Sequence, residues 1–370
     1  MEEFPNPFTP SFGQTPDHLA GRTYLMQQID RAFSSNSRHP ELTAIYSGAR
    51  GTGKTTLLSE TARIATEHGW ITASTTALPG MLDDIELIAK RQANDLISDT
   101  KTTARIKKLG IPKLVEVEFD NEQTPLSNWR SRMTQLLDAL EQFSSGLLIT
   151  VDEIDPTLDE MIELAAVYQH FVRENRQVAL IMAGLPQAVS QLLSSKSASF
   201  VRRANIHKLG NIADFDVRLT LLKTINDGGR TISDEALTCA VSNIGGFAYL
   251  LQLVGFRAWD IAPTQVEITL EDVQQGVRIA QIEMEDRILR TTYNELSPSD
   301  IKFLEAMLPD ANESAISDIT TRLNWSSAQV GKYRRRLIDA GIIGERRRGV
   351  VGWDLPFFQN FIESMTQGIS

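Results

Sequence analysis

The chain has 370 residues, 42% of them apolar and 23% charged, and a formal net charge of −10. At about 150 residues per domain, this length predicts two or three domains of ordinary globular composition. The negative charge argues against a protein whose whole surface is coated by nucleic acid. No apolar run approaches the ~18 residues that a membrane-spanning helix needs.

The cysteine content and the start of the chain indicate the compartment. The single cysteine, Cys239, excludes an internal disulfide and is typical of a reducing environment. The acidic, proline-containing start is unlike a signal or transit peptide. We therefore expect a cytoplasmic protein that does not enter a membrane.

Three elements are predicted before the first motif. Residues 1–20 contain four prolines and predict an extended N-terminal arm. Apolar residues at helical spacing then predict a helix over 21–33. The apolar run 41–48 ends in glycine, as a buried parallel strand does.

A phosphate-binding motif follows this strand. The stretch YSGARGTGKTTLL, residues 46–58, matches G-x-x-x-x-G-K-[ST] and lies between a predicted strand and a predicted helix. Its glycines let backbone amides face anionic oxygens at the start of the helix. Lys54 is expected to reach the β- and γ-phosphates of ATP, and the Thr55 hydroxyl to ligate Mg²⁺. The expected nucleotide-binding residues of the loop are Gly48, Ala49, Arg50, Gly51, Thr52, Gly53, Lys54, Thr55 and Thr56.

Strands and helices alternate after the loop. Apolar runs predict strands near 70–75, 146–153 and 177–184, with amphipathic helices between them. This alternation is typical of an α/β fold, in which a parallel sheet carries helices on both faces. Residues 101–120 interrupt it, and a glycine and a proline near the turn predict a β-hairpin insertion there.

An acidic pair, Asp152 and Glu153, directly follows the second of these strands. Asp152 is expected to hold Mg²⁺, as the aspartate of a Walker-B strand does. Glu153 is expected to orient and deprotonate the attacking water and so to be catalytic. The alternative is an acidic pair that only caps the next helix, since carboxylates favour helix N-termini.

Two arginines, Arg202 and Arg203, follow the next strand and helix. An arginine from the same or a neighbouring subunit can neutralise charge in the transition state of phosphoryl transfer and raise the rate by several orders of magnitude. We expect one of the two to have this catalytic role. The alternative is a solvated pair on the surface.

Two further domains are expected after residue 210. Residues 211–293 show helical patterns only and predict a helical lid. Within residues 294–370, three short helical patterns followed by a basic hairpin predict a winged helix, and residues 296–370 carry nine acidic and nine basic side chains. The P-loop domain would then span 21–210, after the arm.

The basic residues of the winged helix are candidates for contact with DNA. A helical wheel directs part of the third helix outward, and arginines precede the turn of the hairpin. The candidate DNA-binding residues are Lys332, Arg335, Arg336, Arg346, Arg347 and Arg348. Because acidic and basic residues balance over 296–370, a wing that binds protein is the alternative.

With these elements the chain resembles the AAA+/STAND class of P-loop ATPases, on the side that contains the origin-recognition initiators. More narrowly, it is similar to bacterial AAA family ATP-binding proteins common in actinobacteria. The specific signatures are the arm NPFTPSFGQTPDHLAGR, the segment AGLPQ (183–187) and the lid segment GGFAYLLQLVGFRAWDIA (245–262). The resemblance implies that Arg22 lies near the adenine, and it maps the shared arginine onto Arg203.

Three departures from the pattern of the class limit the expected rate. Ala183 and Gly184 stand where many members have a polar sensor residue. Ala248 replaces the proline of the lid signature, and no Gly-x-x-Arg follows, so the second sensor arginine is absent or moved. Arg202 replaces the glutamate that usually precedes Arg203. Hydrolysis is therefore expected to be slow or to depend on a partner.

Two functions remain open. In the first, the chain is an ATPase that holds ATP·Mg²⁺ between the P-loop domain and the lid and couples the nucleotide state to a DNA-binding winged helix. In the second, it is a nucleotide-gated regulatory switch whose winged helix binds protein. The expected partners are ATP or ADP, then DNA, and another copy of the chain or a partner protein.

Overall fold

A computed structural model of the chain describes residues 3–11, 13–35, 37–98, 128–195, 199–311, 313–366 and 368. The predicted β-hairpin at 101–120 lies outside the described residues.

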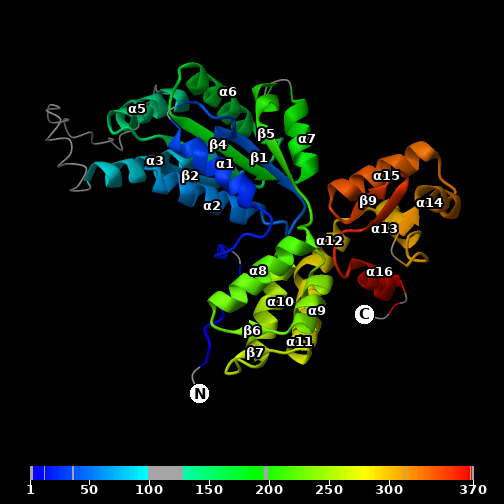
Figure 1. Cartoon of the computed structure of the whole chain (residues 1–370). Coiled ribbons are helices and arrows are strands. Elements are labelled where there is room, and N and C mark those ends of the chain that lie inside the picture. The colour runs from blue at the N-terminus through cyan, green and yellow to red at the C-terminus, as the bar shows by residue number, and fades with distance from the viewer. Residues whose placement is uncertain are drawn as a thin grey trace.

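The first half of the chain forms a five-stranded parallel sheet, as predicted (Figure 1). Its strand order is β2-β3-β4-β1-β5, so β4 lies between the strand of the phosphate loop and the strand of the acidic pair. The strands are β1 Thr43–Gly48, β2 Ile71–Thr76, β3 Leu147–Asp152, β4 Val178–Gly184 and β5 Asn205–Leu209.

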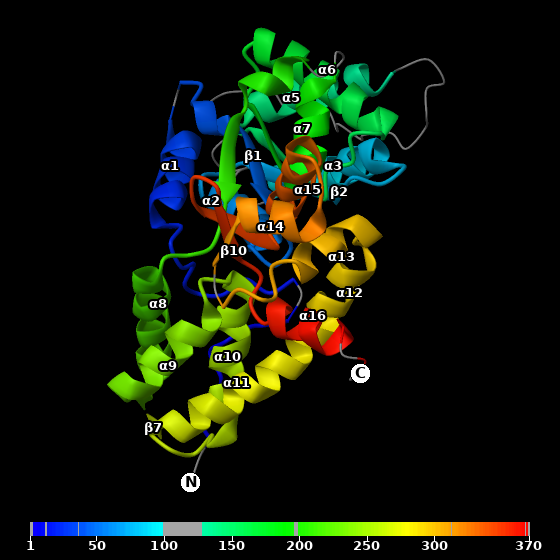
Figure 2. The ribbon, with the colours of Figure 1, turned by 90° about the vertical axis from the view of Figure 1, so that its right-hand side faces the viewer.

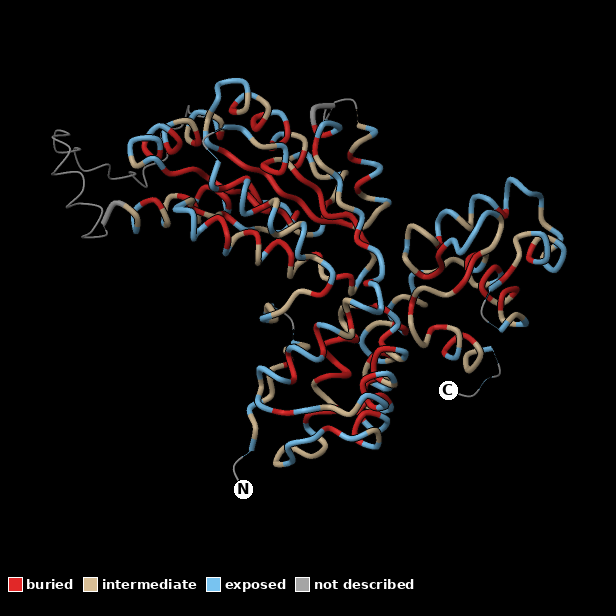
Figure 3. Tube along the Cα trace, viewed as in Figure 1, coloured by how far each residue is buried: buried red, intermediate tan, exposed pale blue. Residues whose placement is uncertain are grey.

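Helices cover both faces of this sheet. They are α1 Thr23–Ser34, α2 Lys54–Glu67, α3 Met81–Ser98, α5 Trp129–Gln142, α6 Asp159–Arg173 and α7 Pro186–Ser194. Because side chains alternate along a strand, Ala44 and Tyr46 of β1 pack in the cluster with α1 and α2. Ile45 packs in the other cluster, with α3, α5 and α6. The buried strands between exposed helix faces are visible in Figure 3.

A helical region, α8–α12, follows the sheet. Its elements are α8 Asp214–Asp227, α9 Asp234–Ile244, α10 Ala248–Ile261, α11 Leu270–Met284, a π-helical turn Glu285–Leu289 and α12 Arg290–Asn294. The prediction of helices alone is incomplete, because β6 Thr231–Ile232 and β7 Glu267–Ile268 form a short parallel pair. This pair joins the loops at one end of the helices.

The N-terminal arm lies on this helical region. The Trp259 indole donates to the carbonyl oxygen of Phe4 at 3.0 Å, and Asn6 Nδ2 donates to the carbonyl of Phe256 at 3.1 Å. The ring of Phe8 is buried against Gly255, where a Cβ would lie 2.4 Å from it. The arm is therefore a packed part of the helical region.

The C-terminal domain contains the three predicted helices and the predicted hairpin, together with an added strand and helix. Its elements are α13 Pro298–Glu305, β8 Glu313–Ala315, α14 Ile316–Leu323, α15 Ser327–Asp339, β9 Ile343–Arg347, β10 Val350–Trp353 and α16 Phe358–Thr366. The strands form an antiparallel sheet in the order β8-β10-β9. Ser297 caps α13 reciprocally with Asp300, and Pro298 occupies the first turn, as expected of a helix start.

One apolar cluster joins the helical region to the C-terminal domain. Leu289 is buried in it, and the ring of Tyr293 meets that of Phe361 edge-on at 5.8 Å between centroids. Figure 2 shows α16 beside α12. Within the described part of the chain, no helix combines the length and apolarity that crossing a membrane requires.

Two helical glycines should respond to alanine in opposite ways. At Gly276 in α11, a Cβ would lie 2.6 Å from the backbone nitrogen of Ala258, whereas at Gly331 in α15 nothing lies within 4 Å. We expect Gly276→Ala to lower the free energy of unfolding by about 1–3 kcal/mol through overpacking. Gly331→Ala should raise it by up to about 1 kcal/mol through helix propensity. Urea denaturation of both variants checks this, and equal effects would contradict the close packing of α10 on α11.

Candidate nucleotide site

The phosphate loop depends on glycine at three positions. Gly51 and Gly53 adopt φ values of +76° and +86°, a backbone conformation that residues with a Cβ atom rarely adopt. A Cβ on Gly48 would lie 2.6 Å from Thr52 Oγ1 and 2.8 Å from the carbonyl oxygen of Leu209. The loop can therefore bring its backbone close to a ligand at the first turn of α2.

Lys54 is buried at the start of α2. Its ammonium donates to the carbonyl oxygens of Gly48 at 3.1 Å and Ala49 at 3.0 Å. Burial lowers the pKa of Lys54 below its usual value, and the carboxylates of Glu153 and Asp152 oppose this effect. The ammonium thus lies beside the loop, close enough to Asp152 and Glu153 for both carboxylates to stabilise its charge.

The two predicted metal ligands meet across the sheet. Thr55 Oγ1 donates to Asp152 Oδ2 at 2.6 Å, although the two residues are 97 positions apart. The carboxyl ends of parallel strands share one edge of the sheet, and this brings the end of β3 to the start of α2. A hydroxyl and one carboxylate fit Mg²⁺, which keeps several waters and takes few protein ligands beside substrate phosphates.

Glu153 stands in an unusual backbone conformation. Its φ is +53°, and its amide donates to Asp152 Oδ1 at 2.9 Å. A left-handed residue other than glycine costs about 1–3 kcal/mol and is frequent at functional sites. Since α6 begins only at Asp159, the alternative that this pair caps the next helix is wrong.

A cavity of about 510 Å³ extends from the loop. It is within the usual size of a cofactor site. Every loop residue from Arg50 to Thr56 lines it, together with Glu153, Arg22, part of the arm and part of the helical region. Gly48 and Ala49 are absent from this lining and instead contribute their carbonyls to Lys54.

Arg22 lines the same cavity from the start of α1. Its guanidinium donates to the carbonyl oxygen of Gly210 at 3.2 Å. Burial lowers the pKa of Arg22, with Asp216 opposing. Arg22 therefore joins the sheet domain to the first residues of the helical region at the cavity wall.

The helical region contacts the loop directly. The amide of Tyr249 donates to the carbonyl oxygen of Gly51 at 3.2 Å. A Cβ on Gly51 would lie 2.4 Å from the ring of Phe247, and the methyl group of Ala248 faces Gly53. The start of α10 thus closes one side of the cavity.

Arg287, which sequence patterns did not single out, also lines the cavity. It donates to the hydroxyl of Tyr249 at 3.3 Å and pairs with Glu283 at 3.1 Å, and these contacts raise its pKa. Arg287 lies in the π-helical turn after α11, far in sequence from the lid signature. No local pattern could have revealed it, because its place in the cavity depends on how α11 packs on α10.

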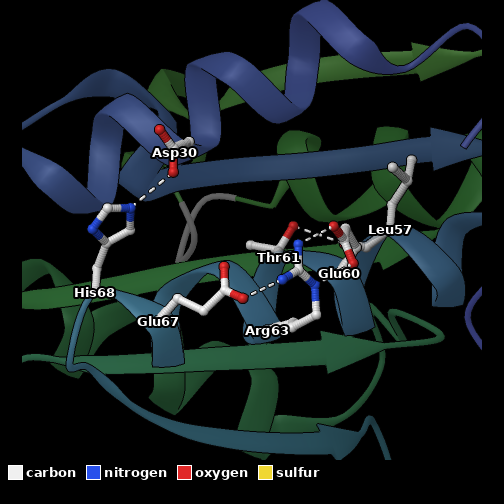
Figure 4. Close-up of polar contacts among 7 residues, drawn as sticks. All are labelled: Asp30, Leu57, Glu60, Thr61, Arg63, Glu67 and His68. Atoms are coloured by element: carbon white, nitrogen blue, oxygen red, sulfur yellow. Dashed lines mark hydrogen bonds and ion pairs between the residues drawn. The ribbon is translucent and has the colours of Figure 1, made fainter. Parts of the chain in front are cut away.

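Polar contacts on the exposed face of α2 hold this helix, which follows the phosphate loop (Figure 4). Arg63 pairs with Glu60 at 2.6 Å and with Glu67 along the helix, and these partners raise its pKa. His68 meets Asp30 of α1 at 2.8 Å. These contacts lie on the side of α2 away from the cavity.

The two candidate arginines lie at the opposite edge of the sheet. Arg202 and Arg203 precede β5, which runs parallel to β1, so that Asn205 pairs with Ala44 near the start of β1. At about 3.3 Å per residue, the six residues of β1 separate them from their own phosphate loop by about 15–20 Å. A role for either arginine on the nucleotide of the same subunit is therefore wrong in this arrangement.

The environments of the two arginines differ. Arg202 Nε donates to the carbonyl oxygen of Leu193 at 2.7 Å. Arg203 is exposed and, among the residues that the structure describes, makes no hydrogen bond or ion pair. It lines a second cavity with Arg38 and Arg173. Arg203 is thus the one that is free to meet another molecule.

The six candidate DNA-binding residues divide into two sets. Arg336 pairs with buried Asp300 at 3.2 Å, Arg346 with Asp354 at 2.7 Å, and Arg347 with Glu313. The second set is exposed and without an ion pair in the described part of the chain, and it consists of Lys332, Arg335 and Arg348.

The predicted outward face of α15 is directed toward the sheet domain. Lys332 and Arg335 line a groove whose other wall includes Gln187 of α7. Helices α15 and α7 contact each other, as Figure 2 also shows. The helical wheel placed Lys332 and Arg335 outside the core of their own domain, but it could not show that another domain stands opposite. Arg336, the third residue of that predicted face, instead pairs with buried Asp300 of α13.

Comparisons with known proteins agree with this architecture. A family profile described as "Domain of unknown function (DUF8462)" matches residues 286–362. No curated protein matches the chain.

Two solved structures share the fold over nearly the whole chain. The Walker-type ATPase PABY2304 of Pyrococcus abyssi has a TM-score of 0.63 at 14% identity and covers 94% of this chain and 97% of its own. The ORC2 protein of Aeropyrum pernix, in ADPNP–ADP complexes, has a TM-score of 0.62 at 14% identity, with 97% and 96% covered. The chain therefore shares the fold of these two proteins, with the predicted parallel sheet between helices, a helical region and a C-terminal domain.

Proposed function

We propose that the chain binds ATP with Mg²⁺ in the cavity beside the phosphate loop and hydrolyses it. The observation that carries the proposal is the 2.6 Å contact of the Thr55 hydroxyl with Asp152, with Glu153 lining the adjacent cavity. The single cysteine supports a cytoplasmic location.

Each side chain would have a defined task. Thr55 and Asp152 would hold Mg²⁺, which when bound neutralises charge on the phosphates. Lys54 would exchange its two carbonyl contacts for phosphate oxygens. Glu153 would orient the attacking water and accept its proton. Arg22 would lie near the adenine, as the resemblance implies.

The end of β4 supports a slow or partner-stimulated reaction. Ala183 and Gly184 bring no polar side chain there, and a Cβ on Gly184 would lie 2.9 Å from Ile154 Cβ. The site therefore lacks a group that many relatives of the class use near the attacking water. This observation favours the second candidate function, a nucleotide-gated switch in which hydrolysis is only a timer.

Binding and turnover should separate in two variants. Lys54→Ala removes charge-assisted contacts worth roughly 1.5–3 kcal/mol, so ATP·Mg²⁺ affinity should fall about 10- to 100-fold in calorimetry. Glu153→Gln should keep affinity within about threefold and lower turnover by about 10²–10⁴. Arg63→Ala, on the far side of α2, is the control and should change neither. Unchanged turnover in Glu153→Gln would reject the catalytic assignment.

Arg203 would act on the nucleotide of a neighbouring copy, which makes a homo-oligomer part of the proposal. Arg203→Ala should then lower turnover by about 10³ or more. Mixing it with inactive Lys54→Ala should restore activity, because the second variant supplies Arg203 to the intact site of the first. A mixture no more active than its components, at concentrations where subunits exchange, would contradict action between subunits. Arg202→Ala is the matched control.

We further infer that the C-terminal domain is a winged helix that binds DNA. The helix order, the hairpin and the exposed cations Lys332, Arg335 and Arg348 support this inference. Because α7 packs against α15, α15 could enter the major groove of a DNA duplex only if the domain moved. A wing that binds protein is the alternative.

The salt dependence of DNA affinity should distinguish these two partners. Replacing Lys332, Arg335 and Arg348 by alanine should flatten the logarithmic salt slope by about 0.9 for each lost phosphate contact. Replacing Arg346 and Arg347, which are held in ion pairs, should flatten it less. If the wild-type protein shows no salt-sensitive DNA affinity with ATP present, the wing binds protein.

A further inference from the structure

The C-terminal domain touches the phosphate loop at both ends of its helical core. Glu295, just before α13, pairs with Arg50 of the loop at 2.9 Å between Oε1 and Nη1. Gly341, just after α15, lies so close to Ala49 that a Cβ there would be 2.2 Å from the Ala49 methyl group. The loop is thus held by two segments that flank the three helices of the domain.

Ala49 connects this contact to the lysine of the loop. Its carbonyl oxygen accepts from Lys54 at 3.0 Å and from the Thr52 hydroxyl at 2.8 Å, while its methyl group faces Gly341. If Lys54 turns toward a phosphate, it leaves this carbonyl. A change in the loop is therefore transmitted directly to the turn that ends α15.

The Arg50–Glu295 pair is placed to compete with an anionic ligand. Arg50 lines the nucleotide cavity, and both side chains of the pair are about half exposed. A polyphosphate would attract the Arg50 guanidinium and repel the Glu295 carboxylate. The guanidinium has donors for both groups, but the repulsion between phosphates and carboxylate weakens the pair with Glu295 when a polyphosphate binds.

The same arrangement places α7 opposite the cationic face of α15. Lys332 and Arg335 face α7 across the groove, and Asp339 lies near enough to Lys208 of β5 for that lysine to affect its pKa. Burial is the larger effect on Asp339 and raises its pKa. The closed arrangement thus leaves Lys332 and Arg335 exposed only within a groove that α7 bounds, which restricts a large polyanion.

We propose that Glu295 is a clasp that holds the C-terminal domain closed, and that the phosphates of a bound nucleotide release it by taking Arg50. Release turns the Lys332–Arg335 face of α15 away from α7 and opens the groove to a partner as large as a DNA duplex. This inference rests on the proposed nucleotide binding. It adds the ion pair through which nucleotide binding would change the position of the C-terminal domain.

Ligand binding and the Arg50–Glu295 pair are linked equilibria. A ligand that weakens the pair must therefore bind more tightly when the pair is removed. Glu295→Gln keeps the size of the side chain and removes its charge, so it should bind ATP·Mg²⁺ several-fold more tightly. Glu295→Lys, which repels Arg50, should go further in the same direction. The matched control is Glu285→Gln, because Glu285 pairs with Arg290 at 3.1 Å in the same segment without touching the loop.

Domain release can be followed by energy transfer between dyes on α7 and α15. In a Cys239→Ser background, labels at exposed positions Gln191→Cys and Gln329→Cys report the separation of the two helices. A non-hydrolysable ATP analogue with Mg²⁺ should lower the transfer efficiency. Glu295→Gln should lower it without nucleotide, and Glu285→Gln should match the parent.

Calorimetry with the same analogue on the same labelled proteins separates the outcomes. Saturable binding with unchanged transfer, in the parent and in Glu295→Gln, overturns the clasp and leaves the proposed function standing. Tighter binding by Glu295→Gln without any change in transfer also overturns domain release. If the folded parent binds no analogue, both the clasp and the proposed function are overturned.

Discussion

The hydrogen bond from Thr55 to Asp152 organises the site, because it joins the start of α2 to the end of β3 across an intervening strand. It requires the carboxyl ends of parallel strands to meet at one edge of the sheet. The two apolar clusters on the faces of the sheet, one with α1 and α2 and one with α3, α5 and α6, hold the strands in that register. The chemistry of the site is thus a consequence of sheet packing.

The phosphate loop is also the meeting point of the other parts of the chain. The helical region reaches it through Tyr249 and Phe247, and the C-terminal domain through Gly341 and Glu295. These contacts differ in kind. The helical region and the C-terminal domain share an apolar cluster, whereas the C-terminal domain meets the loop through an exposed ion pair and one close backbone contact. An exposed pair contributes only about 0–1 kcal/mol, so a charged ligand can displace it.

The arrangement of arginines gives the molecule two distinct faces. Arg22, Arg50 and Arg287 surround the cavity at one edge of the sheet, while Arg203 lies exposed at the other. A single copy therefore carries the cavity beside the phosphate loop and, remote from it, the exposed guanidinium of Arg203. This polarity is the geometric basis for proposing that copies act on one another.

The sequence by itself determined the parts whose signals are local. Alternating apolar runs indicated the parallel sheet, and the glycine spacing of the loop, Lys54, Thr55 and the pair Asp152–Glu153 identified the candidate site, because each follows from a few neighbouring residues. Only the tertiary structure decided that Arg287 lines the cavity, that Arg203 lies too far from its own loop, and that the cationic face of α15 meets α7. Those placements depend on how helices and domains pack over long separations in the chain, and helical or strand periodicity carries no information about which surface stands opposite.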